Sequence, residues 1–390
     1  MIRTATLIRV LVASAALQCA SALAANIVVN STADSGSTCT LRNAITNANN
    51  NSGGNGCAAG SGADTITFDP SVFSTPQTIT VGSTLPHLSD GTTIDGGNMV
   101  TVDGNNTVQI FWVDSSATLR NLVIAHGNAN GTGSNGYYGG GLFTWGSSLE
   151  LDHVTFSGNT ATFGGGGFFT QSGTTTIDSC LFTGNTAPTG TGGGLTNSAA
   201  SLIIRNSTFT GNSAGSGGSG IFTAYGGTMT VTNSTFNGNT ASYYGSAIRN
   251  FSATALTLDY VTISGNPNSG FGAALDTEQD ATTTVKNSIV AGNTGYDCNI
   301  SDSTKFTDLG NNFFGDSTCG RSGNGNPQLN ALGNNGGLTP TMVPQNRSPV
   351  IDTAACDAVT TDQRGLTRPQ NGKCDIGAVE FERIFANGFE

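Results

Sequence analysis

Two carboxylates and one guanidinium occupy the same position in three successive segments of the chain. Asp152, Asp178 and Arg205 each lie seven residues before an Asn that ends a repeated motif, and Glu150 lies two residues before Asp152. If the segments stack, these side chains form one column on an outer face. Carboxylates bind Ca²⁺ and a basic residue can take a proton, as a polysaccharide lyase requires. We therefore take Asp152, Asp178 and Arg205 as catalytic candidates, and Glu150, Asp152 and Asp178 as calcium candidates.

A structural interpretation of the same column competes with the catalytic one and is favoured over it. Stacked opposite charges on a solvated face form an ion-paired column without any chemistry. The sequence offers no other catalytic set: the three histidines, His87, His126 and His153, lie near no nucleophile motif,. The cysteines show no close pairs of the kind that bind zinc,. We expect no cofactor, with calcium as the single alternative.

An internal repeat decides the fold. A Gly-Asn pair recurs behind an apolar residue, and successive Asn residues are 26, 27, 27, 27 and 27 positions apart. The residues three and eight positions before each Asn are apolar, with polar residues between them, which is the alternation of strands buried on one side. The repeated Asn residues are Asn159, Asn185, Asn212, Asn239, Asn266 and Asn293. The repeated aromatic residues are Phe156, Phe182, Phe209 and Phe236.

This period, with short strands and glycine-rich corners, predicts an all-β right-handed parallel β-helix whose coils stack about 4.8 Å apart. The phenylalanines should form a buried ladder. Each Asn should lie inside a turn and bond backbone groups of the coils above and below. Cys180 lies two residues before Phe182, so its side chain should point to the same inward side of the strand. We therefore expect a buried free thiol.

The ends of the solenoid require caps, because exposed strand edges promote aggregation. The spacing of the apolar residues within 40–50 predicts a short amphipathic helix with Leu41, Ala44, Ile45 and Ala48 on one face,. The expected divisions are a signal peptide at 1–24, an N-terminal cap at 25–64, coils at 65–295 that are regular over about 149–293, final coils with a C-terminal cap at 296–382, and an exposed tail at 383–390.

Six cysteines suggest disulfides by their proximity in the sequence. The expected pairs are Cys39–Cys57, Cys298–Cys319 and Cys356–Cys374. Each pair closes a loop of about 20 residues, which stabilises a fold by roughly 3 kcal/mol in the chain-entropy model. Spacing alone does not fix the connectivity.

The first residues predict export. Arg3 and Arg9 precede a short apolar run, and Ala22-Leu23-Ala24 fits a signal-peptidase site,. Removal of this segment leaves 12 basic residues against 25 acidic ones, a formal charge of −13. Nucleic acid is therefore a poor partner. No later stretch approaches the length of a transmembrane helix, so we expect an extracellular or outer-surface protein.

Three segments resemble bacterial surface-protein modules. Cys39-Thr-Leu-Arg-Asn-Ala-Ile45 is similar to the CSLREA motif, with Thr40 and Asn43 as departures. The Phe-x-x-Asn copies resemble the repeats of polymorphic outer-membrane adhesins. Residues 327–380, which include Asp362-Gln-Arg-Gly365, resemble a choice-of-anchor Q domain. These resemblances imply a parallel β-helix displayed at, or released from, a bacterial surface, and imply no chemical activity.

The sequence therefore favours a binding role over catalysis. We expect an adhesin-like protein that binds an extracellular polysaccharide, or a host or matrix surface; the alternative is a polysaccharide lyase or glycoside hydrolase. Aromatic residues near loops are available for stacking on sugars, although they equally serve to cover turns. These residues are Tyr137, Tyr138, Trp145, Tyr225, Tyr243 and Tyr244.

Overall fold

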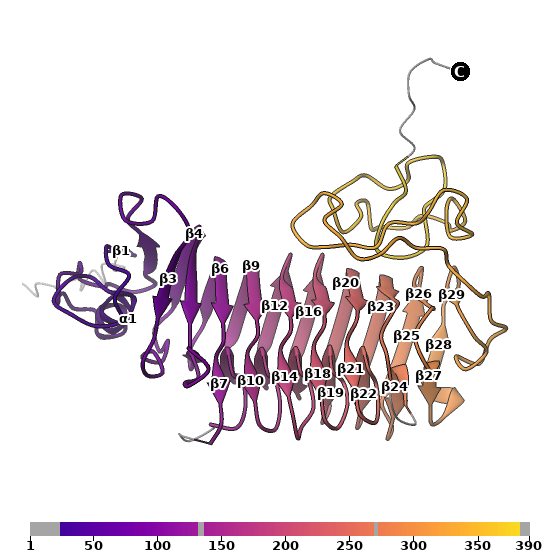
Figure 1. The fold of residues 1–390 in the computed structure, drawn as a ribbon, viewed down its shortest axis with the longest axis horizontal. Coiled ribbons are helices and arrows are strands. Elements are labelled where there is room, and N and C mark those ends of the chain that lie inside the picture. The colour runs from indigo at the N-terminus through magenta and orange to yellow at the C-terminus, as the bar shows by residue number, and fades with distance from the viewer. Residues whose placement is uncertain (1–23, 132–135, 269–271, 383–390) are drawn as a thin grey trace, which may run out of the picture.

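The chain winds into a right-handed parallel β-helix, as predicted. The structure, a computed structural model, describes residues 24–131, 136–268 and 272–382. The strands stack coil upon coil along one axis for about nine turns (Figure 1). All pairings between the named strands are parallel, so residues one period apart lie beside each other. Three sheets form the walls of the solenoid.

The first sheet has 16 strands and carries the regular repeat. Its strands are β1 (Asn26–Val29), β2 (Thr65–Phe68), β3 (Gln77–Thr80), β4 (Thr92–Asp103), β6 (Ala117–Ala125), β9 (Ser148–Ser157), β12 (Thr174–Asp178), β13 (Leu181–Thr183), β16 (Ser201–Arg205), β17 (Thr208–Thr210), β20 (Thr228–Asn237), β23 (Ala255–Ile263), β25 (Thr282–Lys286), β26 (Ile289–Val290), β28 (Phe306–Asp308) and β29 (Phe313–Phe314).

Two smaller sheets close each coil. The second sheet contains β5 (Phe111–Val113), β8 (Leu142–Trp145), β11 (Phe168–Gln171), β15 (Leu195–Ser198), β19 (Ile221–Ala224), β22 (Ile248–Phe251), β24 (Ala273–Glu278) and β27 (Tyr296–Ile300). The third sheet contains β7 (Asn128–Ala129), β10 (Thr160–Ala161), β14 (Thr186–Ala187), β18 (Ser213–Ala214) and β21 (Thr240–Ala241). Glycines such as Gly165, which has a φ of +62°, turn the chain between the third and second sheets,.

The phenylalanine ladder fills the interior. The rings of Phe156, Phe182, Phe209 and Phe236 are fully buried. They stack nearly parallel, with centroids 4.5 to 4.9 Å apart. Each buried ring stabilises the fold by roughly 1.5–3 kcal/mol through the hydrophobic effect. The repeat spacing therefore translates directly into a continuous apolar core.

The asparagine ladder runs beside the phenylalanines, and each Asn bonds to the coil before it and to the coil after it. Asn185 donates from its backbone and side-chain nitrogens to the Oδ1 atom of Asn212, at 3.0 and 2.9 Å. Its side chain also donates to the carbonyl of Phe156, one coil back, at 3.0 Å. The arrangement repeats to Asn293, whose Nδ2 donates to Oδ1 of Asp297 at 2.9 Å. A carboxylate thus ends the ladder.

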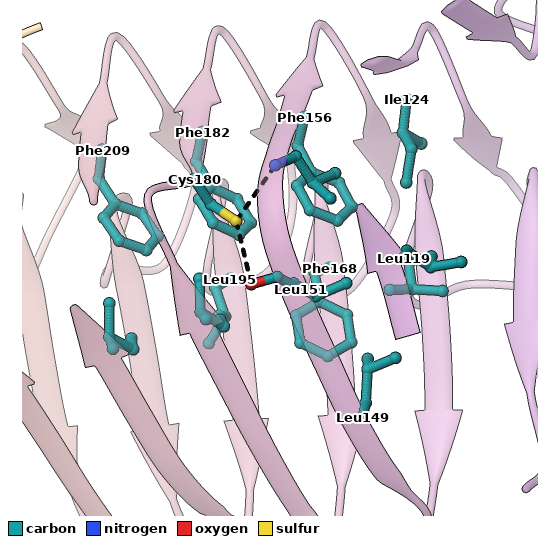
Figure 2. Packing of buried hydrophobic residues seen from close by; sticks show 14 of the residues in the cluster. Leu119, Ile124, Leu149, Leu151, Phe156, Phe168, Cys180, Phe182, Leu195 and Phe209 are labelled. Carbon is teal, nitrogen blue, oxygen red and sulfur yellow. Dashed lines mark hydrogen bonds between the residues drawn. The ribbon is translucent and has the colours of Figure 1, made fainter. Parts of the chain in front are cut away.

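Cys180 is a buried free thiol, as predicted. Its sulfur lies beside the Phe156 and Phe182 rings and interacts with the Val154 N–H at 3.4 Å and the Leu151 carbonyl at 3.5 Å (Figure 2). Burial raises the pKa of the thiol far above its ordinary value,. Cys180 is therefore a packing residue and no nucleophile.

The N-terminal end carries the predicted helix. Helix α1 (Leu41–Asn50) begins after Thr40, whose hydroxyl accepts a hydrogen bond from the Asn43 N–H at 3.2 Å,. The predicted apolar face, including Ile45, is buried. The disulfide Cys39–Cys57 joins the start of the helix to the loop after it. The other two expected disulfides, Cys298–Cys319 and Cys356–Cys374, are also formed.

The C-terminal segment differs from the predicted cap. Strands β27, β28 and β29 do continue the coils, but residues 327–382 fold back along the side of the solenoid instead of only closing its end (Figure 1). We call these residues the side lobe. It makes hydrogen bonds to residues spread over several coils, from Asn206 to Asn287. Isolated polar contacts and a separate apolar cluster, in which Val350 and Ile376 of the lobe join Ile289 of the solenoid, hold the lobe in place. Neither leaves a periodic signal in the sequence.

Buried polar groups join the side lobe to the first sheet. Gln363 bridges two neighbouring coils: Thr235 donates to its side-chain oxygen at 2.6 Å, and its nitrogen donates to the Thr208 hydroxyl at 2.8 Å. Arg368 and Glu380 form an ion pair in which both side chains are fully buried. The Arg368 guanidinium also lies 4.0 Å from the centre of the Tyr260 ring. The expected signal peptide and tail fall on residues 1–23 and 383–390, outside the described residues.

Candidate functional site

The structure brings the predicted charged column together. Strand register places Asp152 beside Asp178, and Asp178 beside Arg205, on the first sheet. Arg205 Nε lies 3.3 Å from an Asp178 oxygen, and Asp152 is within ion-pair distance of His153. Earlier in the same column, Arg120 contacts Asp95 at 2.9 Å. Each aspartate of this column therefore has a basic residue beside it.

Glu150 lies in the adjacent column, beside Thr118 and Thr176. Its carboxylate accepts a long hydrogen bond from the Thr118 hydroxyl at 3.4 Å. Glu150 and Arg205 line an open hollow of about 520 Å³ among threonines and serines. Over the described ranges, no three His, Cys, Asp or Glu residues are grouped to hold a metal ion. The calcium candidates Glu150, Asp152 and Asp178 thus form no such cluster.

A second column, on the outer face of the second sheet, was not anticipated. Register aligns one residue from each of six strands, β5, β8, β11, β15, β19 and β22. These residues are Trp112, Phe143, Phe169, Thr196, Phe222 and Arg249. Trp112 and Phe143 have ring centroids 4.6 Å apart, and Phe143 and Phe169 stack at 5.5 Å. The column forms an aromatic floor along the solenoid axis.

Thr196 interrupts this aromatic floor. The smaller side chain leaves a hollow of about 350 Å³ between Phe169 and Phe222. We call this hollow the aromatic groove. It is lined by Tyr138, Phe143, Phe163, Phe169, Gln171, Thr191, Thr196, Ser198, Phe222 and Tyr225. Its size and its mixture of aromatic and polar groups are typical of small-molecule and oligomer binding sites.

The rim of the aromatic groove faces solvent. Tyr225 is 66% exposed and Phe163 is 46% exposed. The side chains of Gln171 and Ser198 make no hydrogen bond to any residue of the described segments. In contrast, the Thr196 hydroxyl donates to the Thr191 carbonyl at 2.9 Å. The groove therefore offers exposed rings together with polar groups that are free to bond a ligand.

Arg249 continues the floor beyond Phe222 but offers no free charge. Its guanidinium lies 2.7 Å from a Glu278 oxygen. It also lies over the Tyr244 and Phe251 rings, 4.6 and 4.9 Å from their centres. Ion pairing and enclosure between rings make it a structural end to the groove.

Asp276 follows Arg249 in the column and is fully buried. Burial raises its pKa to about 7, the Glu278 carboxylate adds to the rise, and Asn299 and Arg249 oppose it. A carboxyl group with a raised pKa beside a second carboxyl group suits acid–base chemistry in other settings. Asp276 has no exposed surface through which to meet a substrate, so we assign it no catalytic role.

We expect Asp276 to make the stability of the fold depend on pH. Because the folded-state pKa is raised above the unfolded value, the native state binds the extra proton and stability falls as pH rises from about 4 to about 7,. The contribution has a slope of at most about 1.4 kcal/mol per pH unit. In denaturant titrations across this range, Asp276→Asn should show a shallower pH dependence than the native protein. Parallel pH profiles for the two proteins would contradict the assignment.

The sequence found only part of this site. Of the aromatic residues proposed for stacking, Tyr138 and Tyr225 line the groove, and Tyr137 packs against Phe163 at 4.9 Å. Tyr244 encloses Arg249 instead. The floor phenylalanines were missed, although a signal exists: each directly follows the buried apolar residue after a glycine-rich corner, as Phe143 and Phe169 do.

In the parts of the chain that the structure describes, no helix is long and apolar enough to cross a membrane.

Comparison with known proteins agrees with the architecture. No curated protein matches the chain. Residues 89–253, which cover β4 to β22 and the aromatic groove, match the family described as right handed beta helix region.

Proposed function

We propose that this protein is an exported bacterial surface or secreted protein that binds an extracellular polysaccharide through the aromatic groove. The observation that carries the proposal is the hollow at Thr196, which has aromatic residues on its floor and rim and unbonded polar groups beside them. The apolar C–H face of a sugar ring packs against aromatic rings, while its hydroxyls require hydrogen-bond partners. Gln171 and Ser198 meet the second requirement.

Export is part of the proposal and is supported by cysteine chemistry. Three disulfides are typical of proteins that fold in oxidising compartments,. The similarity of residues 39–45 to the CSLREA motif, of the repeats to polymorphic adhesins, and of residues 327–380 to choice-of-anchor Q domains favours display at, or release from, a cell surface. An adhesin-like role in contact with a host or matrix glycan is consistent with the same groove.

We favour binding over the lyase or hydrolase alternative. A proton acceptor must be free to reach its substrate. In the column of Asp152, Asp178 and Arg205, the charged groups are already engaged with one another or with His153. The column therefore supports stability of the outer face better than it supports catalysis.

Affinity electrophoresis and pull-down on a panel of plant and microbial polysaccharides test the function. We expect retention by at least one polymer, and at least tenfold weaker binding when Tyr225→Ala and Phe163→Ala remove the exposed rim rings. Tyr296→Ala is the matched control, since Tyr296 is 56% exposed but lies on β27, outside the groove. If Tyr296→Ala weakened binding as much as Tyr225→Ala and Phe163→Ala do, the groove would not be the binding site. Shortened polymer chains after incubation would favour the lyase or hydrolase alternative.

A further inference from the structure

We propose that the aromatic groove takes an uncharged, extended polysaccharide whose chain runs parallel to the solenoid axis, with successive sugar rings advancing coil by coil. This assignment rests on the function proposed above and adds two properties of the ligand, its charge class and its direction. Both follow from which side chains the coils bring into one line.

The direction follows from the walls of the groove. Its floor is a register column of four neighbouring strands, from Phe143 on β8 to Phe222 on β19. One wall is a second column along the same axis, in which bridges align Tyr138, Gly164 and Thr191. The other wall, Gln171 and Ser198, is a third such column. Since all three columns run along the axis, the hollow between them is elongated in that direction.

The spacing of the coils suits such a ligand. Neighbouring strands are about 4.8 Å apart, so four strands span about 14 Å. The advance of one sugar ring along an extended glycan is similar to one coil step. A chain along the axis therefore meets one floor position and its neighbouring wall positions at each ring. A chain across the axis would leave the groove after one ring.

The charge class of the ligand follows from the residues that line the aromatic groove. None of the ten lining residues carries a charged side chain. Arg249, the nearest cation in the floor column, is ion-paired with Glu278 at 2.7 Å. A polyuronate would have to lose water from its carboxylates without gaining a cationic partner, which is unfavourable. The formal charge of −11 for the whole chain adds repulsion against an anionic polymer,.

Calorimetric titration with two series of oligosaccharides tests both properties. One series contains neutral β-linked glucan, xylan and mannan fragments of increasing length, and the other contains polyuronate fragments of the same lengths. We expect the neutral series to bind, with affinity rising at least tenfold from the disaccharide until the groove is filled. Because no charges meet, the affinity should change less than twofold between low and high salt.

The outcomes separate this inference from the proposed function. A preference for polyuronates, or affinity that falls with salt, would overturn the neutral class while polysaccharide binding itself stands. A disaccharide that binds as tightly as longer fragments would overturn the axial direction. Failure of both series, and of the polymers from which they derive, would remove the proposed function as well.

Three variants test whether the oligosaccharides bind in the aromatic groove. Thr196→Phe completes the aromatic floor and fills the hollow, so affinity for neutral oligosaccharides should fall at least tenfold. Thr257→Phe makes the same substitution at an exposed position on the first sheet and should bind as the native protein does. Tyr225→Ala removes rim area without adding bulk and should also weaken binding if Thr196→Phe fails to fold. Native affinity in folded Thr196→Phe would overturn the site.

Discussion

Asn212→Ala is expected to destabilise the solenoid by about 4 kcal/mol, more than any surface substitution. The substitution removes the acceptor for two donors of Asn185, its backbone and side-chain nitrogens. It also removes the side-chain donor to the Phe182 carbonyl, 2.9 Å away. Since Asn185 and Asn212 are fully buried, each unsatisfied donor costs about 1–3 kcal/mol,. Urea unfolding followed by circular dichroism measures the loss.

Asn237→Ala is the matched control for the ladder. Asn237 lies in the next coil and is only partly buried, and its side chain makes one bond, to the Ser264 carbonyl at 2.8 Å. Its loss should cost about 1 kcal/mol. If the two variants shifted the unfolding midpoint equally, the ladder would contribute no more than isolated hydrogen bonds do.

Arg368→Met is expected to cost about 3–5 kcal/mol and to loosen the side lobe before the coils. The substitution leaves the Glu380 carboxylate fully buried without its cation, which is the costly way to break a buried ion pair,. It also removes bonds to the carbonyls of Gly377 and Asp375, at 2.8 and 3.3 Å. Hydrogen exchange should show lost protection in residues 327–382 while β9 to β17 keep theirs.

Two further variants test the cause of that loss. Arg321→Met breaks an exposed ion pair with Asp308 at 2.8 Å and should cost less than about 1 kcal/mol,. Adding Glu380→Gln to Arg368→Met removes the orphaned charge, so part of the stability should return. Arg368→Met that is no less stable than Arg321→Met would show that the buried pair does not hold the lobe.

The features that repeat were predictable from the sequence, and the features that do not repeat were not. The register of Asp152, Asp178 and Arg205 follows from the period alone, because parallel coils stack residues one repeat apart. The phenylalanines that line the groove were not distinguished from those of the core, since both sets occur in the same glycine-rich repeats. In the structure Phe169 points outward while its neighbour Phe168 points inward, which matches the order of the two residues after the glycine-rich corner.

The groove and the side lobe depend on single exceptions to the repeat. The hollow exists because one coil has Thr196 where its neighbours have phenylalanine. The lobe is held by residues such as Gln363, which bonds to Thr208 and Thr235. In the sequence these two threonines resemble the other polar residues that face outward from the first sheet. No periodicity marks either feature, so sequence patterns alone could not locate them.

The asparagine ladder gives the molecule a modular length. Inside the ladder, each Asn presents the same donors to one neighbour and the same acceptor to the other. The ends differ: Gly127 donates to Asn159 at one end, and Asp297 accepts from Asn293 at the other. A whole coil inserted or deleted between Asn185 and Asn266 would leave each donor with an acceptor. The aromatic groove reaches into that stretch, since its lining extends from Tyr138 to Tyr225. Gene duplication of single coils could therefore lengthen or shorten the surface on which a polymer lies, while the interior stays chemically unchanged.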